Sequence, residues 1–343
     1  MRRCTRCVLP DTVPGITFNA EGACSYCQRY QPQQSLGVET LEHLVAAAKK
    51  SAHKYDCVVA ASGGRDSTYV LYLAKAVYDL NVLAVHYDHE FVVPHAMANL
   101  RTACERLKID LVSIRSQRGV GRKLVRAGLR CSDKYACFAL CRACEYGYHS
   151  AAYRAAIQHK VPMIWWGASK LEHTDDLRSM IPKPSFARRL SKFLNVNLYR
   201  TIQYSLLQQF EFPVPGNPIS PRAIPALKDK DIKEVFVFDH IGWERNKIKD
   251  TIAKELGWQK PPGSISTWRT DCSLYPLANY CYFKACGCSK ACFGYCNMIN
   301  SGQMRREEAL HQEEYMKEHC GDTIEALLRD EVGLSAGEVA KML

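Results

Sequence analysis

Long apolar runs are absent from this chain of 343 residues. No stretch reaches the roughly 18 consecutive apolar residues that a membrane-spanning helix requires, which excludes helical membrane proteins. No apolar segment follows Met1-Arg2-Arg3 either, so we expect no secretory signal, no membrane partner and a cytoplasmic location. Internal repeats and low-complexity segments are also lacking, and 47% hydrophobic residues with 24% charged residues are typical of a globular protein.

Cysteine, in contrast, is abundant, with 17 residues in the chain. Because the cytoplasm keeps thiols reduced, we expect metal binding or redox chemistry rather than disulfides. The two CxxC pairs, Cys4 with Cys7 and Cys24 with Cys27, predict a structural zinc ribbon over residues 1–30. Four thiolates complete a tetrahedral Zn²⁺ site, so this metal would stabilise the fold without taking part in a reaction.

The segment Ser62-Gly63-Gly64-Arg65-Asp66-Ser67 follows an apolar run that begins at Cys57. Residues 68–80, which come next, are apolar enough and long enough to form a helix. At a strand-to-helix turn, glycines let backbone N–H groups approach an anion, and the helix N-terminus adds partial positive charge. The segment therefore predicts a pyrophosphate site, although the phosphate-binding pattern GxxxxGK[ST] is absent.

This SGGxDS pattern resembles the signature of the PP-loop ATP pyrophosphatases, which cleave ATP between the α and β phosphates and adenylate a carbonyl oxygen. The resemblance implies that ATP and Mg²⁺ are cofactors and that Asp66, a catalytic residue, helps to place the Mg²⁺. It also implies that Gly167 contacts the adenosine. The residues expected to bind the nucleotide are Ser62, Gly63, Gly64, Arg65, Asp66, Ser67 and Gly167. An ordinary strand-to-helix turn is the alternative interpretation.

Strand and helix patterns alternate through the middle of the chain. Strands are expected at 57–61, 82–86, 109–114 and 161–166, and helices at 39–53, 68–80 and 94–107. This alternation predicts an α/β fold with a parallel sheet and helices on both faces. Ligands of such sheets bind at the carboxyl ends of the strands, where the SGGRDS segment, Gly167, Tyr87 and Asp88 are expected.

Three regions are expected along the chain. They are the zinc ribbon at 1–30, an ATP-binding α/β domain at 31–239, and a helical, cysteine-rich region at 240–343. The middle region carries a basic insertion, residues 177–210, which has six Lys and Arg residues and no acidic residue. This insertion is either a solvated surface or a contact for a nucleotide-sugar diphosphate, an RNA backbone or a partner protein.

A further cysteine group, Cys137, Cys141 and Cys144, has the spacing of one helical face. These thiols are either buried structural residues or the ligands of a [4Fe-4S] cluster with one open iron. Together with Cys272 they are also candidate catalytic thiols. Helical spacing also relates Cys288, Cys292 and Cys296. Residues 305–317 are expected to be helical, and 323–343 to form an amphipathic helical unit that covers the sheet or joins subunits.

Several segments together resemble the N-acetyl sugar amidotransferases of surface-polysaccharide biosynthesis. They are CTRCVLPDTVPGITFNAEGACSYC, ASGGRDST, WWGAS, LGWQKPP, WRTDC and NYCYFK. The resemblance implies an ATP-dependent amidotransferase that adenylates the N-acetyl carbonyl of a nucleotide sugar. Ammonia-derived nitrogen then replaces the oxygen, and AMP and pyrophosphate are released. Because this chain has no glutaminase signature, a separate glutaminase partner is implied as the source of ammonia.

The extra cysteines depart from that family and are similar to those of the PP-loop tRNA thiolation enzymes, which combine zinc knuckles with cysteines or an iron–sulfur cluster. Under this second hypothesis a sulfide or persulfide attacks the adenylated carbon, and the acceptor is tRNA or a small metabolite. It requires a thiolate of low pKa near the ATP site. A third hypothesis is a metal-stabilised ATP-binding protein without transfer chemistry. The acceptor and the oligomeric state stay open.

Overall fold

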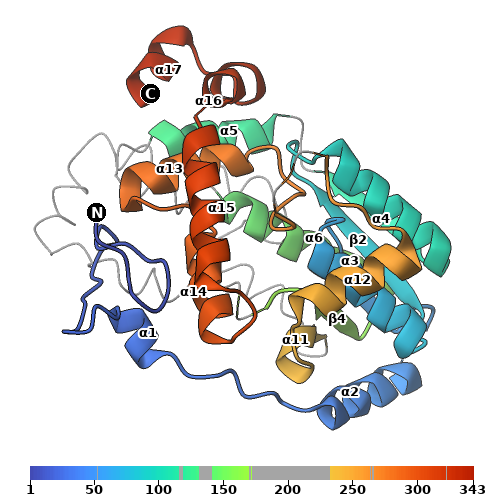
Figure 1. Cartoon of the computed structure of the whole chain (residues 1–343). Coiled ribbons are helices and arrows are strands. Elements are labelled where there is room, and N and C mark those ends of the chain that lie inside the picture. The colour runs from blue at the N-terminus through green and yellow to red at the C-terminus, as the bar shows by residue number, and fades with distance from the viewer. Residues whose placement is uncertain are drawn as a thin grey trace, which may run out of the picture.

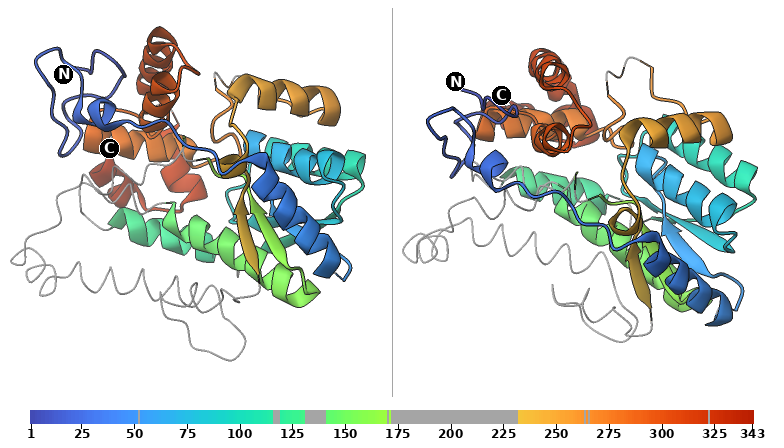
Figure 2. Two further views of the ribbon diagram at one scale, coloured as in Figure 1. Left: turned by 90° about the horizontal axis from the view of Figure 1, so that it is seen from below. Right: turned by 60° about the horizontal axis from the view of Figure 1, so that its bottom comes forward.

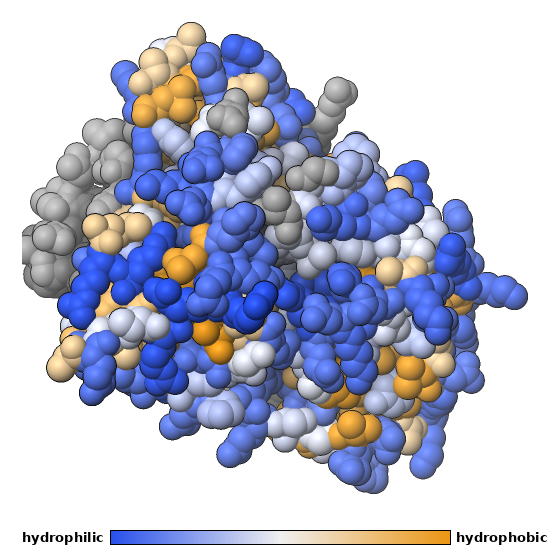
Figure 3. Space-filling view, in the orientation of Figure 1, coloured by the Kyte–Doolittle hydropathy of each residue, from blue (hydrophilic) through white to orange (hydrophobic). Residues whose placement is uncertain are grey.

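The computed structural model describes most of the chain outside one long segment. The described residues are 1–51, 53–115, 119–130, 141–169, 171, 232–262, 264, 266–321 and 323–343. Cys137 and the predicted basic insertion lie outside them. No helix within these ranges is long and apolar enough to cross a membrane. The face shown in Figure 3 is largely hydrophilic, with apolar residues scattered over it.

Five parallel strands form one sheet in the order β3-β2-β1-β4-β5 (Figure 1). On the central strand, Val58 pairs with Leu83 of β2 on one side and with Ile164 of β4 on the other. A central strand of a parallel sheet is covered on both faces, which explains the continuous apolar run in β1. The strands are β1 (Cys57–Ala60), β2 (Val82–Asp88), β3 (Asp110–Arg115), β4 (Met163–Trp166) and β5 (Lys233–Phe236).

Helices cover both faces of the sheet (Figure 2), so the predicted α/β fold class is confirmed. Because strand side chains alternate between faces, Val59 and Trp165 pack with α2, α3, α4 and α12, whereas Val58 and Ile164 pack with α6. These helices are α2 (Val38–Ser51), α3 (Arg65–Tyr72), α4 (Pro94–Leu107), α6 (Arg142–His159) and α12 (Arg245–Leu256). The π-helical turn η1 (Leu73–Val77) continues α3.

The C-terminal region is helical, as predicted. Its tail packs through Leu328 and Val339 with Val125 of α5 and Leu277 of α13, so it covers these two helices rather than the sheet. The remaining elements are α1 (Ser25–Arg29), α5 (Val120–Arg130), α11 (Val237–His240), α13 (Tyr275–Cys286), α14 (Cys292–Asn300), α15 (Arg306–His319), α16 (Ile324–Ala326), the π-helical turn η4 (Leu327–Glu331) and α17 (Ala336–Met342).

The four cysteines of the N-terminal CxxC pairs converge on one point. Their Sγ atoms all lie within 4.8 Å of one another, and all four residues are buried. Backbone N–H groups point at the sulfur atoms, as in the contact of 3.1 Å from Cys24 N to Cys4 Sγ. Such donors stabilise thiolates, so the ribbon has the form of a closed metal site. Zinc as the metal stays a prediction.

The ribbon packs against the C-terminal helices rather than standing alone. Arg306 of α15 donates hydrogen bonds of 3.0 Å to the carbonyl oxygens of both Cys4 and Cys7. A fifth thiol, that of Cys296 in α14, lies 3.8 Å from Cys27 Sγ. The helical alignment expected for the C-terminal cysteines holds only in part, because Cys288 lies before the first residue of α14.

Replacing one ribbon cysteine tests this arrangement. We expect Cys4→Ser to lose the bound zinc and to destabilise the protein by about 3 kcal/mol or more, because a structural metal contributes directly to folding. Zinc content and the unfolding temperature measure the two effects. Cys320→Ser, at the partly exposed end of α15, is the matched control and should retain both. A zinc-free Cys4→Ser protein with unchanged unfolding temperature would contradict the prediction.

Candidate active site

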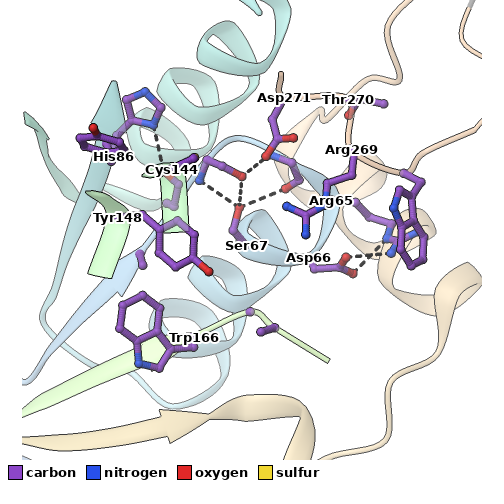
Figure 4. Close-up of a pocket in the computed structure, with 18 of the residues that line it drawn as sticks. Arg65, Asp66, Ser67, His86, Cys144, Tyr148, Trp166, Arg269, Thr270 and Asp271 are labelled. Carbon is purple, nitrogen blue, oxygen red and sulfur yellow. Dashed lines mark hydrogen bonds and ion pairs between the residues drawn. The ribbon is translucent and has the colours of Figure 1, made fainter. Parts of the chain in front are cut away.

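A pocket of about 240 Å³ opens at the carboxyl ends of the central strands (Figure 4). Its wall combines residues of the SGGRDS segment, the ends of β2 and β4, the beginning of α6 and residues 267–271. This is the edge of the sheet at which the sequence predicts a ligand. The glycine loop, defined here as residues 62–67, joins β1 to α3 and forms the floor of the pocket.

Gly63 allows the glycine loop to pack directly on α4. Its φ of +82° belongs to the left-handed region, and an added Cβ would lie 1.9 Å from the carbonyl oxygen of Ala96. Only glycine fits such a position. On the other side, Trp258 Nε1 donates a hydrogen bond of 3.0 Å to the carbonyl oxygen of Gly63. The loop is therefore held between α4 and Trp258, which lies two residues beyond the end of α12.

Two serine hydroxyls shape the floor of the pocket. Ser67 Oγ accepts from Ser62 N at 3.2 Å, and Ser62 Oγ accepts from Gly64 N at 3.3 Å. Gly64 is the N-cap residue of α3 and has no side chain with which to cap the first-turn N–H groups. Uncapped N–H groups at a helix N-terminus suit a phosphate oxygen. Gly167 lies against this turn, since a Cβ there would be 3.1 Å from Ser67 Cα.

The side chains of Arg65 and Asp66 bind each other. Arg65 donates to both carboxylate oxygens of Asp66, at 2.9 and 2.7 Å, and to Thr267 Oγ1 at 2.8 Å. Trp243 Nε1 donates to the same carboxylate at 3.0 Å, and its ring lies 4.9 Å from the guanidinium carbon. The Arg65 side chain is only 2% exposed. Two residues of the motif therefore tie the glycine loop to later parts of the chain.

Aromatic side chains form the wall beside β4. The ring of Trp166 lies 5.9 Å from that of Tyr148 and 4.4 Å from that of His149. Tyr87 at the end of β2 also lines the pocket, and it fits because α6 has Gly147 there, where a Cβ would lie 2.2 Å from the tyrosine ring. Flat aromatic surfaces of this kind suit a nucleobase. Asp88 instead accepts a hydrogen bond of 2.7 Å from Arg115.

Two histidines at the end of β2 also line the pocket. His86 Nδ1 lies 3.1 Å from the carbonyl oxygen of Ala61, so this nitrogen carries the proton. Its Nε2 is buried and has no hydrogen-bond partner within the described part of the chain. Burial lowers the pKa of both His86 and His89 below the ordinary imidazole value. Both rings are therefore neutral at pH 7.

Three cysteines gather beside the pocket from two parts of the chain. Cys144 in α6 lines it, Cys141 is the N-cap residue of α6, and Cys272 lies in a segment that pairs with the chain leaving β2. Burial raises the pKa of the Cys144 thiol, and the nearby thiols of Cys272 and Cys141 raise it further. Of the predicted group, Cys137 lies outside the described residues, and only Cys144 lies within the helix itself.

These three thiols, which we call the pocket thiols, differ from the ribbon cysteines in spacing. Within the described ranges, the ribbon sulfur atoms are the one group of three or more ligand atoms that all lie within 4.8 Å of one another. The three pocket thiols therefore do not all lie within this distance of one another.

Cys141 has a cationic partner from the C-terminal region. Lys290 Nζ lies 2.8 Å from Cys141 Sγ. Burial acts to raise the pKa of this thiol, but the charge and hydrogen bond of Lys290 outweigh it, so the pKa of Cys141 lies below its ordinary value. Burial instead raises the pKa of Cys272 to about 12. Of these two thiols, Cys141 is thus the one that ionises more readily.

No family model matches the chain. A stretch of 114 residues, 32% of the chain, is 29% identical to an uncharacterised protein from Methanocaldococcus jannaschii. The match spans 41% of that relative, which is less than half of its length.

Two solved structures align with most of this chain. NMN synthetase from Francisella tularensis is 12% identical to this chain. The alignment covers 87% of this chain and 94% of the synthetase chain, with a TM-score of 0.39. The second structure is that of the U34-tRNA thiolase NcsA from Methanococcus maripaludis with its [4Fe-4S] cluster, which is 13% identical. The alignment covers 99% of this chain and 95% of the thiolase chain, with a TM-score of 0.35. Both TM-scores are below 0.5.

Several residues of the site were not predicted from the sequence. His86, His89, Tyr148 and Asp271 line the pocket, and Lys290 contacts Cys141 beside it. The WRTDC resemblance was the one signal that pointed to Asp271. Lys290 follows Ser289 in a cysteine-rich stretch, and its contact with Cys141 is made only in the folded chain.

The partnership of Lys290 with Cys141 predicts a change in thiol reactivity. We expect Lys290→Met to raise the pKa of Cys141 and to slow its alkylation by iodoacetamide at pH 7 by about tenfold, the effect of one pKa unit. Peptide mass spectrometry of metal-free protein over a pH series measures this rate. Lys290→Arg should keep most of the lowering of the Cys141 pKa. Lys284→Met is the matched control, because the Lys284 ammonium group contacts the carbonyl oxygen of Leu343 instead of a thiol. Identical pH profiles for wild type and Lys290→Met would refute the assignment.

Proposed function

We propose that this protein is an ATP-dependent adenylating enzyme that transfers sulfur to a carbonyl carbon. The observation that carries the proposal is the meeting of two groups at one pocket. The glycine loop forms its floor, and the pocket thiols, one of them paired with Lys290, lie at its side. Thiols beside an ATP site are needed for sulfur transfer and are not needed for transfer of ammonia.

The nucleotide half of the site supports binding of ATP. The N-terminus of α3 and the serine hydroxyls of the glycine loop suit the phosphates, and the rings of Tyr148 and Trp166 suit the adenine. The resemblance to the PP-loop ATP pyrophosphatases gives the expected reaction. The carbonyl oxygen of the acceptor attacks the α-phosphorus, pyrophosphate leaves, and the oxygen becomes part of an adenylate.

The thiol half supplies the second step. A hydrosulfide attacks the adenylated carbon, the carbon–oxygen bond breaks, and AMP leaves with the original oxygen while a proton is released. This converts C=O into C=S with every atom accounted for. The acceptor is a tRNA base or a small carbonyl metabolite. The pocket thiols would hold a cofactor that binds the sulfide next to the carbon, where proximity favours attack.

The pocket thiols also fit a [4Fe-4S] cluster. Burial and mutual repulsion raise the pKa of Cys144, so the thiolate forms need nearby positive charge. Lys290 provides some of this charge at Cys141. Cys141, Cys144 and Cys272 would hold the cluster, and the cluster would supply an iron site for the sulfide. Cys272 joins Cys141 and Cys144 in this proposed set. Cys137 lies outside the described residues, so its membership stays a prediction.

Amidotransfer to a nucleotide sugar is a second candidate, and one observation favours it. Of the segments that resemble the sugar amidotransferases, ASGGRDST, WWGAS and WRTDC line the pocket, and LGWQKPP contacts its glycine loop. Trp258 of LGWQKPP supports Gly63, and Asp271 of WRTDC lines the wall. In this case ammonia from a separate glutaminase would attack the same adenylate.

The choice of nucleophile distinguishes the two candidates. We expect release of AMP and pyrophosphate from ATP to require sulfide and unmodified bulk tRNA or a small carbonyl metabolite, with ammonia giving little turnover. Cys141→Ser should reduce the rate by about 100-fold or more, because the sulfur would no longer be held at the carbon. Cys320→Ser is the matched control. Chromatographic measurement of AMP under anaerobic conditions follows the reaction.

The other outcomes are equally informative. Release of AMP that depends on ammonia and a UDP-N-acetyl sugar, with Cys141→Ser unaffected, would replace sulfur transfer by amidotransfer. No release of AMP with either nucleophile and any of these acceptors would favour an ATP-binding protein without transfer chemistry.

A further inference from the structure

The carboxylate of Asp66 is already occupied by protein donors. Its Oδ1 accepts from Arg65 Nε at 2.9 Å and from Trp243 Nε1 at 3.0 Å, and its Oδ2 accepts from Arg65 Nη2 at 2.7 Å. A carboxylate oxygen has about two lone-pair directions, so Oδ1 is fully used. A divalent cation on Oδ2 would also lie close to the guanidinium charge, which repels it. Asp66 therefore does not fit the Mg²⁺ role that the sequence resemblance implies.

Asp271 is the other carboxylate in the pocket wall. Its Oδ2 lies 3.4 Å from the position that a Cβ would take on Gly64, directly beside the N-terminus of α3. Figure 4 shows this carboxylate next to the glycine loop. Its backbone is fixed, because Val93 N donates to the carbonyl oxygen of Asp271 at 3.2 Å and Ser273 N donates to that of Phe91 at 2.9 Å. The carboxylate thus has a defined place at the phosphate site.

A negative carboxylate at a phosphate site needs an explanation. Alone it would repel the nucleotide, whereas a divalent cation between the two groups would attract both. Mg²⁺ prefers hard oxygen ligands and is commonly held by one or two carboxylates together with substrate phosphates. The neighbouring histidines do not supply positive charge at pH 7, because burial lowers the pKa of His86 and His89. The guanidinium of Arg65 is already bound to Asp66 and Thr267, and Arg269 is a further positive charge in the pocket wall.

We propose that Asp271 is the protein ligand of the divalent cation that accompanies the nucleotide phosphates, and that Asp66 is a positioning residue. Asp66 holds Arg65 and Trp243 in place and so fixes the first turn of α3. The inference rests on the proposed ATP site but not on whether nitrogen or sulfur is transferred. It moves the metal-binding role from the SGGRDS motif to the C-terminal WRTDC segment.

Nucleotide binding with and without a divalent cation tests this assignment. The probe is α,β-methylene-ATP, which cannot be cleaved between the α and β phosphates, and calorimetry gives its Kd in buffer with Mg²⁺ or with no divalent cation added. We expect Mg²⁺ to tighten binding to wild type and Asp271→Asn to reduce this tightening by about tenfold or more. Without the cation, Asp271→Asn should bind as well as wild type or better, because a repulsive charge is gone.

Three further variants complete the experiment. Asp271→Glu should recover part of the Mg²⁺ effect, and Asp250→Asn, on the exposed surface of α12, should match wild type. Asp66→Asn should retain the Mg²⁺ effect but lower the unfolding temperature. Electron paramagnetic resonance of Mn²⁺ with the same nucleotide gives a second readout, in which Asp271→Asn loses the protein-bound signal.

The outcomes separate this inference from the proposed function. The inference would be overturned, while the ATP site stands, if Mg²⁺ tightened nucleotide binding to Asp271→Asn as much as to wild type. It would also be overturned if Asp66→Asn alone lost this tightening and kept the wild-type unfolding temperature. If Mg²⁺ does not tighten nucleotide binding to wild type, the inference is likewise overturned while the ATP site stands. If wild type does not bind the nucleotide under either condition, the proposed function fails and the inference fails with it.

Discussion

Two backbone hydrogen bonds hold the C-terminal segment across the pocket, and the candidate site depends on them. They join Val93 to Asp271 and Ser273 to Phe91, and so pair residues that lie far apart in the sequence. Without them neither the carboxylate of Asp271 nor the thiol of Cys272 would have a fixed position beside the glycine loop. The site is therefore composite, with phosphate-binding groups from the sheet and a carboxylate and a thiol from the C-terminal region.

The metal ribbon contributes to the same arrangement from a distance. It packs on α14 through Cys296 and on α15 through Arg306. The opposite side of α14 receives Trp268, which fits because a Cβ on Gly294 would lie 2.3 Å from its ring. Trp268 is itself part of the pocket wall. A chain of packed groups thus leads from the ribbon to the wall of the pocket.

Much of this structure could be predicted from local sequence. The apolar runs gave β1 to β4 within two or three residues, and the expected helix over residues 94–107 coincides with α4. The CxxC pairs predicted the ribbon ligands, because two cysteines at this spacing are placed by the local chain to bind one metal ion. Strand β5 was missed, since its four residues include Lys233 and Glu234 and show little apolar character. The pairing of Arg65 with Asp66, the place of Asp271 and the contact of Lys290 with Cys141 depend on tertiary packing that no local pattern shows.

The metal content of the protein tests the central claim most directly, namely that Cys141, Cys144 and Cys272 form one sulfur site beside the nucleotide. Zinc, iron and acid-labile sulfide would be measured on protein purified without oxygen, for wild type and for the variant with all three residues changed to alanine. The account predicts about one zinc with about four irons and four sulfides per chain in wild type. The variant should keep the zinc and lose the iron and sulfide. Zinc alone in both proteins, even after reconstitution with iron and sulfide, would contradict the account and leave the pocket thiols without a shared role.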